Sequence, residues 1–139
     1  MTEFLWPLRV YYEDTDSAGV VYYANYLKFM ERARTEFVRS LGFEQDQLKE
    51  QQGIVFVVRN VSLQLHQPAR FNDALEVVTS LQKMARTNIV FRQAIRRAGE
   101  QDSLCEGEIQ VVCVAAESWK PSAIPKVMLE AMNNKGASV

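Results

Sequence analysis

Hydrophobic residues recur along positions 26–41 with the spacing of an α-helix. They are separated by four, three, four and four positions: Tyr26, Met30, Ala33, Phe37 and Leu41. This spacing places them on one face of a helix of about five turns. Gly42 follows where a left-handed residue commonly closes a helix. Arg32, Arg34 and Arg39 lie in the half of the helix where cations suit its dipole.

The hydrophobic period changes to two after Gly53. Alternation at Val61, Leu63 and Leu65 predicts a strand with one buried face, which ends before Pro68. Further alternating runs cover residues 75–81, 89–95 and 105–115, with polar connections at 85–87 and 98–102. A β-branched and aromatic run, Leu8–Tyr12, predicts a first strand. Since the helix and the sheet each need their apolar face covered, we predict an α+β fold with an antiparallel sheet wrapped around one long helix.

The remainder of the chain predicts one domain. Its 139 residues are the size of a single ordinary domain. Residues 120–125 contain two prolines and predict a loop, and residues 126–131 predict a short terminal helix. We therefore expect a domain over residues 1–132 and a frayed C-terminal tail over residues 133–139.

Charge and hydropathy exclude two classes of partner. Sixteen Lys and Arg residues against seventeen Asp and Glu give a formal net charge of −1, so no global field favours nucleic acid. The longest apolar run, Ile54–Val58, is far shorter than the roughly 20 residues of a membrane helix, and the N-terminus lacks a signal pattern. These features predict a cytoplasmic protein without a membrane span.

The two cysteines predict no disulfide and no metal site. Cys105 and Cys113 are eight residues apart in one predicted strand, which separates them by about 26 Å. The sequence has a single histidine, His66, and no Cys-x-x-Cys pair. We expect two buried thiols in a reducing compartment, and neither metal nor cofactor.

The candidate chemistry lies in the polar turn Glu13-Asp14-Thr15-Asp16-Ser17-Ala18-Gly19, between the first strand and the helix. A helix N-terminus presents unpaired N–H groups that can hold the oxygen of a polarised carbonyl. A carboxylate one loop away could attack that carbonyl or deprotonate a water aimed at it. The alternative is that Asp14 and Asp16 only shape the turn. Gly19 fits both interpretations as a position with positive φ.

A family resemblance distinguishes these alternatives. The run Tyr-x-Asp-Thr-Asp-x-x-Gly-Val-Val-Tyr at 12–22 is followed by Ala-Asn-Tyr at 24–26 and Glu-Arg-Ala-Arg-Thr-Glu at 31–36. Val-Phe-Val-Val-Arg at 55–59, Pro-Ala-Arg at 68–70 and Val-Val-Cys-Val at 111–114 continue the match. The sequence resembles the YbgC-type acyl-CoA thioesterases of the 4-hydroxybenzoyl-CoA thioesterase family over nearly its whole length. The resemblance implies a hotdog fold and hydrolysis of an acyl-CoA to the free acid and CoA.

The resemblance also implies roles for individual residues. Asp16 would be the nucleophile or the general base, and the backbone N–H of Tyr23, seven residues later, would polarise the carbonyl. Many YbgC-type members carry histidine at position 23, whereas the benzoyl-CoA type carries tyrosine. At this position of the acyl pocket, the chain is therefore like the benzoyl-CoA type. Gly19, Tyr22 and Asn25 match the motif and are assigned to the helix start and the substrate pocket.

Partners follow from the same resemblance. Such domains pair their sheets edge to edge as homodimers or homotetramers with active sites between subunits, and an exposed strand edge gives a motive for pairing. Arg86, with Arg59 and Lys83 behind it, is the candidate for the CoA phosphates, the alternative being solvated charges at strand ends. YbgC-type proteins are associated with the Tol-Pal envelope system and phospholipid synthesis, which implies acyl carrier protein or lipid-synthesis enzymes as partners.

Two other functions compete with hydrolysis. A hydratase would pair histidine with a carboxylate, but His66 is distant from Asp16 in sequence, and we expect it at the surface or an interface. A non-catalytic module would bind acyl-CoA or acyl carrier protein without needing Asp16. The acyl group itself cannot be deduced from alternating strands.

Overall fold

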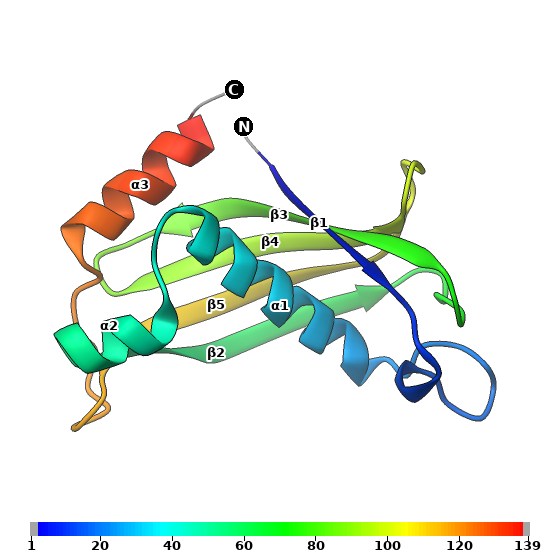
Figure 1. Cartoon of the computed structure of the whole chain (residues 1–139), viewed down its shortest axis with the longest axis horizontal. Coiled ribbons are helices and arrows are strands. Elements are labelled where there is room, and N and C mark those ends of the chain that lie inside the picture. Colours follow the sequence, from blue (N-terminus) through cyan, green and yellow to red (C-terminus); the bar gives the residue numbers. More distant parts are fainter. Residues whose placement is uncertain (1–2, 138–139) are drawn as a thin grey trace.

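Five strands form one antiparallel sheet against a long helix, as the computed structural model shows for residues 3–137 (Figure 1). The strands lie in the order β1-β3-β4-β5-β2. Their bounds are β1 Phe4–Arg9, β2 Ile54–Leu65, β3 Ala74–Met84, β4 Asn88–Arg97 and β5 Ser103–Ala115. The helix that packs on this sheet is α1, Ala24–Ser40. The predicted α+β architecture and the meander from β3 to β5 are confirmed.

Helix α1 buries the face that its sequence predicts. Its apolar buried residues are Tyr26, Phe29, Met30, Ala33, Phe37 and Val38. Leu41, the last residue of the predicted face, is the C-cap and only half-buried. Gly42 takes φ 94°, which confirms the left-handed residue predicted to end the helix.

Arg34 is buried on the same helix face, where a charged side chain needs hydrogen-bond partners. Its Nη1 donates to Oε1 of Gln93 in β4 at 2.9 Å. The Gln93 amide donates in turn to the Met30 carbonyl at 3.0 Å and to Oγ1 of Thr79 in β3 at 2.9 Å. Burial lowers the pKa of Arg34, yet a guanidinium keeps its proton in proteins. The network fixes α1 to two strands by polar contacts inside the core.

Gly107 allows α1 to approach β5 closely. A Cβ added at this position would lie 3.2 Å from Sδ of Met30 and 3.2 Å from the Ser62 carbonyl oxygen. A glycine inside a strand weakens it unless another group needs the space. Here the Met30 side chain occupies that space.

Strand β1 is displaced from its predicted position. It ends at Arg9, three residues before the predicted end at Tyr12, because the chain turns into a short 3₁₀ helix, η1, at Tyr12–Asp14. Oδ2 of Asp14 accepts the backbone N–H of Tyr11 at 2.8 Å, which stabilises this turn.

Strand β2 lies at the sheet edge and leaves predicted core residues uncovered. Val61 is 47% exposed and Leu65 is 54% exposed, so the prediction that this face is buried is wrong for the single chain. The pairing with β5 also shifts register between Val58 and Asn60. An edge strand has no neighbour on one side, and within residues 3–137 these two side chains stay about half exposed.

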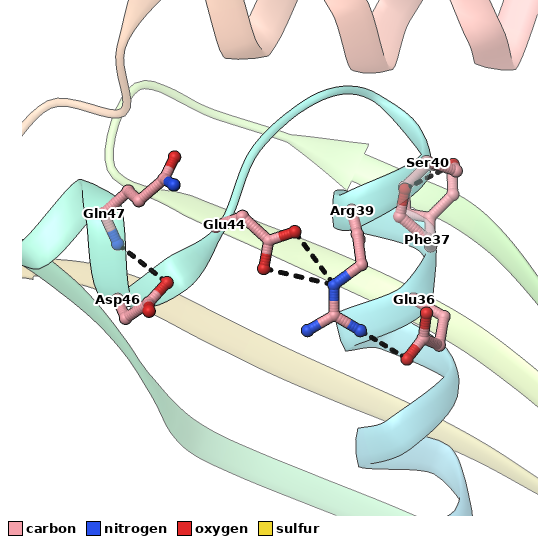
Figure 2. A network of polar contacts seen from close by, with 7 residues as sticks. All are labelled: Glu36, Phe37, Arg39, Ser40, Glu44, Asp46 and Gln47. Carbon is pink, nitrogen blue, oxygen red and sulfur yellow. Dashed lines mark hydrogen bonds and ion pairs between the residues drawn. The ribbon is translucent and has the colours of Figure 1, made fainter.

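Two further helices, α2 and α3, lie toward the end of the sheet opposite the segment that connects η1 to α1 (Figure 1). Helix α2, Gln45–Gln52, was not predicted, because its sequence is polar and only Leu48 is buried. Figure 2 shows how it follows α1: Nε of Arg39 donates to both carboxylate oxygens of Glu44, at 3.1 and 3.0 Å, and Nη1 donates to Glu36. Together these bonds hold the connection between the two helices.

Helix α3, Lys126–Ala137, starts where predicted and runs six residues further. It buries Met128 and Met132 in the core. Residues 133–137 of the expected tail are part of this helix, and residues 138–139 lie outside the described residues.

The cysteines lie in β5 as predicted, buried and unpaired. Burial raises the pKa of the Cys105 thiol from 9.0 to about 12 and raises that of Cys113 as well. No helix among residues 3–137 has the length and apolar character needed to cross a membrane.

Candidate active site

Asp16 organises the loop between η1 and α1. Its N–H donates to the Val20 carbonyl at 2.9 Å, and its own carbonyl accepts the Gly19 N–H at 3.0 Å. Its Oδ1 accepts the Ala18 N–H at 2.8 Å, and Gly19 takes φ 83°. The side chain thus shapes the turn, but through one oxygen only. Within residues 3–137, Oδ2 has no hydrogen-bond partner and is exposed with the rest of the side chain.

The N-terminus of α1 has an unused donor. Tyr23 is the N-cap with φ −56° and ψ −32°, and no side chain in the described part of the chain caps the helix. Asn25 donates its side-chain amide to the Asp14 carbonyl at 2.9 Å, and the Tyr22 N–H donates to that same oxygen at 2.9 Å. The Tyr23 N–H makes no hydrogen bond to any of the described residues. A free N–H at a helix start can receive an oxygen that carries developing negative charge.

A segment distant in sequence closes the site. The Val21 N–H donates to the Ala69 carbonyl at 2.8 Å, and Val20 forms an isolated antiparallel bridge with Arg70. The Ala69 N–H donates to the hydroxyl of Tyr26 at 3.0 Å. Burial raises the pKa of Tyr26, so its phenol stays neutral. These contacts fix the residues that follow β2 against the Asp16 loop.

Between the two segments lies a pocket of about 310 Å³. It is lined by Asp16, Val20, Val21, Tyr23, Tyr26, Leu65, His66, Gln67 and Pro68. Most of its wall is apolar, and it is lined both by Asp16 and by Tyr23, the residue whose N–H is free. An electrophilic carbonyl on an apolar group fits this combination of donor, carboxylate and wall.

His66 is exposed, as expected of a surface histidine, and it also lines this pocket. Its Nε2 is 3.0 Å from Oε2 of Glu106 in β5. Its place in the pocket could not be predicted from the sequence, because it depends on how the end of β2 packs on the loop. The signal available was the motif Pro-Ala-Arg at 68–70, which directly follows and makes the contacts to the loop.

The other predicted site residues do not line the pocket. Gly19, Tyr22 and Asn25 shape the loop and the helix start instead. Lys83 and Arg86 lie at the opposite end of β3 from the Asp16 loop (Figure 1). The strand begins just after the pocket, so they are about 33 Å away along it. Arg59 is exposed at the bulge of β2.

Residues 3–137 contain no group of three or more His, Cys, Asp or Glu side chains placed to hold a metal ion.

Comparisons with known proteins identify a family. Residues 10–132 match the model of the thioesterase-like superfamily. The acyl-CoA thioester hydrolase YbgC of Escherichia coli is 48% identical over 125 residues, which cover 90% of this chain and 92% of that protein. The acyl-CoA thioesterase YbgC of Haemophilus influenzae is 40% identical over 131 residues, 94% of this chain and 95% of that protein.

A solved structure shares the fold. Slr0204, a 1,4-dihydroxy-2-naphthoyl-CoA thioesterase from Synechocystis, superposes with a TM-score of 0.88 at 22% identity, covering 95% of this chain and 96% of that one. The expected hotdog fold is confirmed by this likeness together with the family match.

Proposed function

This chain belongs to the thioesterase-like superfamily, among the YbgC-type thioesterases, and from that premise we propose that it hydrolyses acyl-CoA to the free acid and CoA with Asp16 as the catalytic carboxylate. The observation that carries the proposal is the pocket in which the Asp16 carboxylate and the helix-start residue Tyr23 lie together. Both belong to one short loop, so their relative position is set by local hydrogen bonds.

The proposed chemistry uses the free groups of that loop. The thioester oxygen accepts the Tyr23 N–H, which stabilises the negative charge that develops when the carbonyl carbon is attacked. Oδ2 of Asp16 attacks the carbon or takes a proton from a water that attacks it. In both routes the bond between the carbonyl carbon and the sulfur breaks, and CoA leaves with the sulfur atom. The apolar wall around Tyr26 and Leu65 suits an acyl group rather than a charged one.

The test is thiol release from short, long and aromatic acyl-CoAs by wild type and by Asp16→Asn. The substitution preserves shape and removes the charge, and we expect turnover to fall by about 10²-fold or more while folding is unchanged. The panel also identifies the acyl class.

Asp14→Asn is the matched control. Asp14 belongs to the same loop and also accepts a backbone N–H, but it does not line the pocket. Its variant should turn over acyl-CoA near the wild-type rate. Equal rates in wild type and Asp16→Asn would leave Asp16 as a turn-forming residue only, and binding of acyl-CoA without thiol release would favour a non-catalytic binding module.

We propose that β2 pairs with β2 of a second copy. Its exposed Val58, Val61 and Leu65 lie on an edge strand, a surface that soluble proteins rarely leave open. In an antiparallel pair of β2 strands, the end of one sheet where β3 ends lies near the Asp16 loop of the other subunit. Arg86, with Arg59 and Lys83, could then approach CoA phosphates bound at the other subunit's pocket.

Size-exclusion chromatography with light scattering tests this pairing. Wild type should elute as a dimer or tetramer, and Val61→Lys, which places a charge on the exposed edge, should shift it toward monomer. A wild-type monomer would contradict the pairing.

A cytoplasmic location and partners in lipid synthesis belong to the same proposal. Cys105 and Cys113 are unpaired, which suits a reducing compartment. The association of YbgC-type proteins with the Tol-Pal system and phospholipid synthesis supports acyl carrier protein or a lipid-synthesis enzyme as the partner. Co-purification of acyl carrier protein with a tagged form of this chain is the corresponding measurement.

A further inference from the structure

His66 is a pocket residue that the hydrolysis described above does not use. It directly follows β2 and lines the pocket with Asp16 and Tyr23. Its backbone N–H donates to the Leu104 carbonyl at 2.9 Å, and the N–H of Gln67 donates to the same oxygen at 3.0 Å. The backbone on which this imidazole is carried is therefore fixed to β5.

The ring is oriented by a carboxylate. Nε2 of His66 lies 3.0 Å from Oε2 of Glu106, whose Oε1 is 3.8 Å from Arg92. When Nε2 donates its hydrogen to that carboxylate, the neutral ring carries its lone pair on Nδ1. Nδ1 has no hydrogen-bond partner among the described residues. A carboxylate that holds one ring nitrogen and leaves the other as a base is the arrangement that activates water and hydroxyl groups in hydrolases.

The chemistry of Asp16 requires such a base if Asp16 is the nucleophile. An aspartate joined to the acyl group in an anhydride has lost the charge with which it could deprotonate water. The second half of the reaction then needs another proton acceptor in the pocket. Among the described residues that line it, the remaining side chains that can exchange a proton are two tyrosines and His66, and imidazole is the commonest general base in enzymes.

We infer that Asp16 is the nucleophile and that His66, held by Glu106, is the base of the hydrolytic step. An oxygen of Asp16 bonds to the thioester carbon, the carbon–sulfur bond breaks, and CoA leaves as the thiolate. His66 then takes a proton from a water whose oxygen attacks the acyl carbon of the anhydride. The bond from that carbon to Asp16 breaks, which regenerates the carboxylate and releases the acid, and the proton on His66 passes to the thiolate. This division of roles rests on the proposed thioesterase function.

The test is rapid-mixing measurement of thiol release by His66→Gln, with the best acyl-CoA of the panel. Glutamine keeps an N–H for Glu106 and removes the base. The first turnover should stay within a few-fold of wild type, while steady-state turnover falls by roughly 10²-fold or more, so one thiol per site appears in a burst. Hydroxylamine attacks an anhydride without a base, so it should restore steady-state turnover and yield the acyl hydroxamate.

Glu106 and Glu108 offer a matched pair for the positioning role. Both carboxylates project from β5 toward Arg92, at 3.8 and 3.7 Å, but only Glu106 contacts His66. Glu106→Gln should give the same burst with a steady-state loss of roughly 10-fold or more, and hydroxylamine should reverse that loss. Glu108→Gln should match wild type in both phases.

Three results would overturn the role of His66 and leave the proposed function standing. They are wild-type kinetics in His66→Gln, loss of the first turnover together with the steady state and without a burst, or a slow steady state that hydroxylamine does not accelerate. Failure of the proposed function looks different. Wild type that releases no thiol from any acyl-CoA, or an Asp16→Asn variant that is fully active, would remove the thioesterase mechanism and this inference with it.

Discussion

Replacing Tyr23 by proline isolates the backbone donor from the side chain. Proline has no N–H, and its ring fixes φ near −65°, close to the −56° of Tyr23. The Tyr23 N–H makes no hydrogen bond to the described residues, so its removal breaks no contact within them. Proline is also well accepted at the start of a helix. Tyr23→Pro should therefore fold and lose only the donor aimed at the carbonyl oxygen.

The expected loss follows from the role of that donor. Removing one oxyanion donor costs about 10²- to 10³-fold in kcat, or roughly 2.7–4 kcal/mol of transition-state stabilisation. The measurement is kcat and KM for thiol release, with circular dichroism and urea unfolding to check the fold. Tyr23→Ala is the control, because it keeps the N–H and removes the ring. We expect it to keep kcat within about 10-fold and to change acyl preference.

Two outcomes would refute the reasoning. A folded Tyr23→Pro with wild-type kcat would show that the N–H does not act on the carbonyl. Equal losses in Tyr23→Pro and Tyr23→Ala would assign the effect to the aromatic ring.

Three further predictions concern the core. Gly107→Ala places a Cβ 3.2 Å from Sδ of Met30 and should destabilise the fold by about 1–3 kcal/mol in urea unfolding; unchanged stability would mean that α1 relaxes freely. Gln93→Leu removes the oxygen that accepts the hydrogen bond of the buried Arg34, and it should lower the free energy of unfolding by about 3 kcal/mol. Unchanged stability would contradict this role of Gln93. The Cys105 pKa is raised to about 12, so the folded state binds the proton more tightly than the unfolded state. Its contribution to stability is complete below pH 9 and declines as the pH rises toward 12. Urea unfolding at pH 8 to 10.5 should show this decline, and Cys105→Ala should reduce the slope.

Most of the fold could be predicted because its patterns are local. Helix α1 and the strands β3 to β5 each repeat their apolar residues with the period of the element itself. Helix α2 could not be predicted in this way, since it buries only Leu48 and its polar sequence carries no period. Strand β1 was misplaced because the bond from Asp14 to the Tyr11 N–H, rather than the apolar character of the run, ends the strand.

The same distinction between local patterns and contacts of distant segments applies to the candidate site. Asp16 and Tyr23 could be proposed together because they belong to one loop, and the position of a turn relative to the helix that follows is a local property. The phosphate contacts proposed for Lys83 and Arg86 depend on a second subunit, because within one chain these residues lie at the end of β3 opposite the Asp16 loop, and a charge pattern does not encode that position.

By itself, the sequence determined the helix with its buried face, the three-stranded meander, and the acidic turn that precedes a helix N-terminus, because each depends on residues close together in the chain. Only the tertiary structure decided that His66 enters the pocket of Asp16 and that Arg34 is buried against Gln93. It also left Val61 exposed on the sheet edge. These three outcomes depend on strand order and on contacts between segments some 40 to 60 residues apart, which no local pattern encodes.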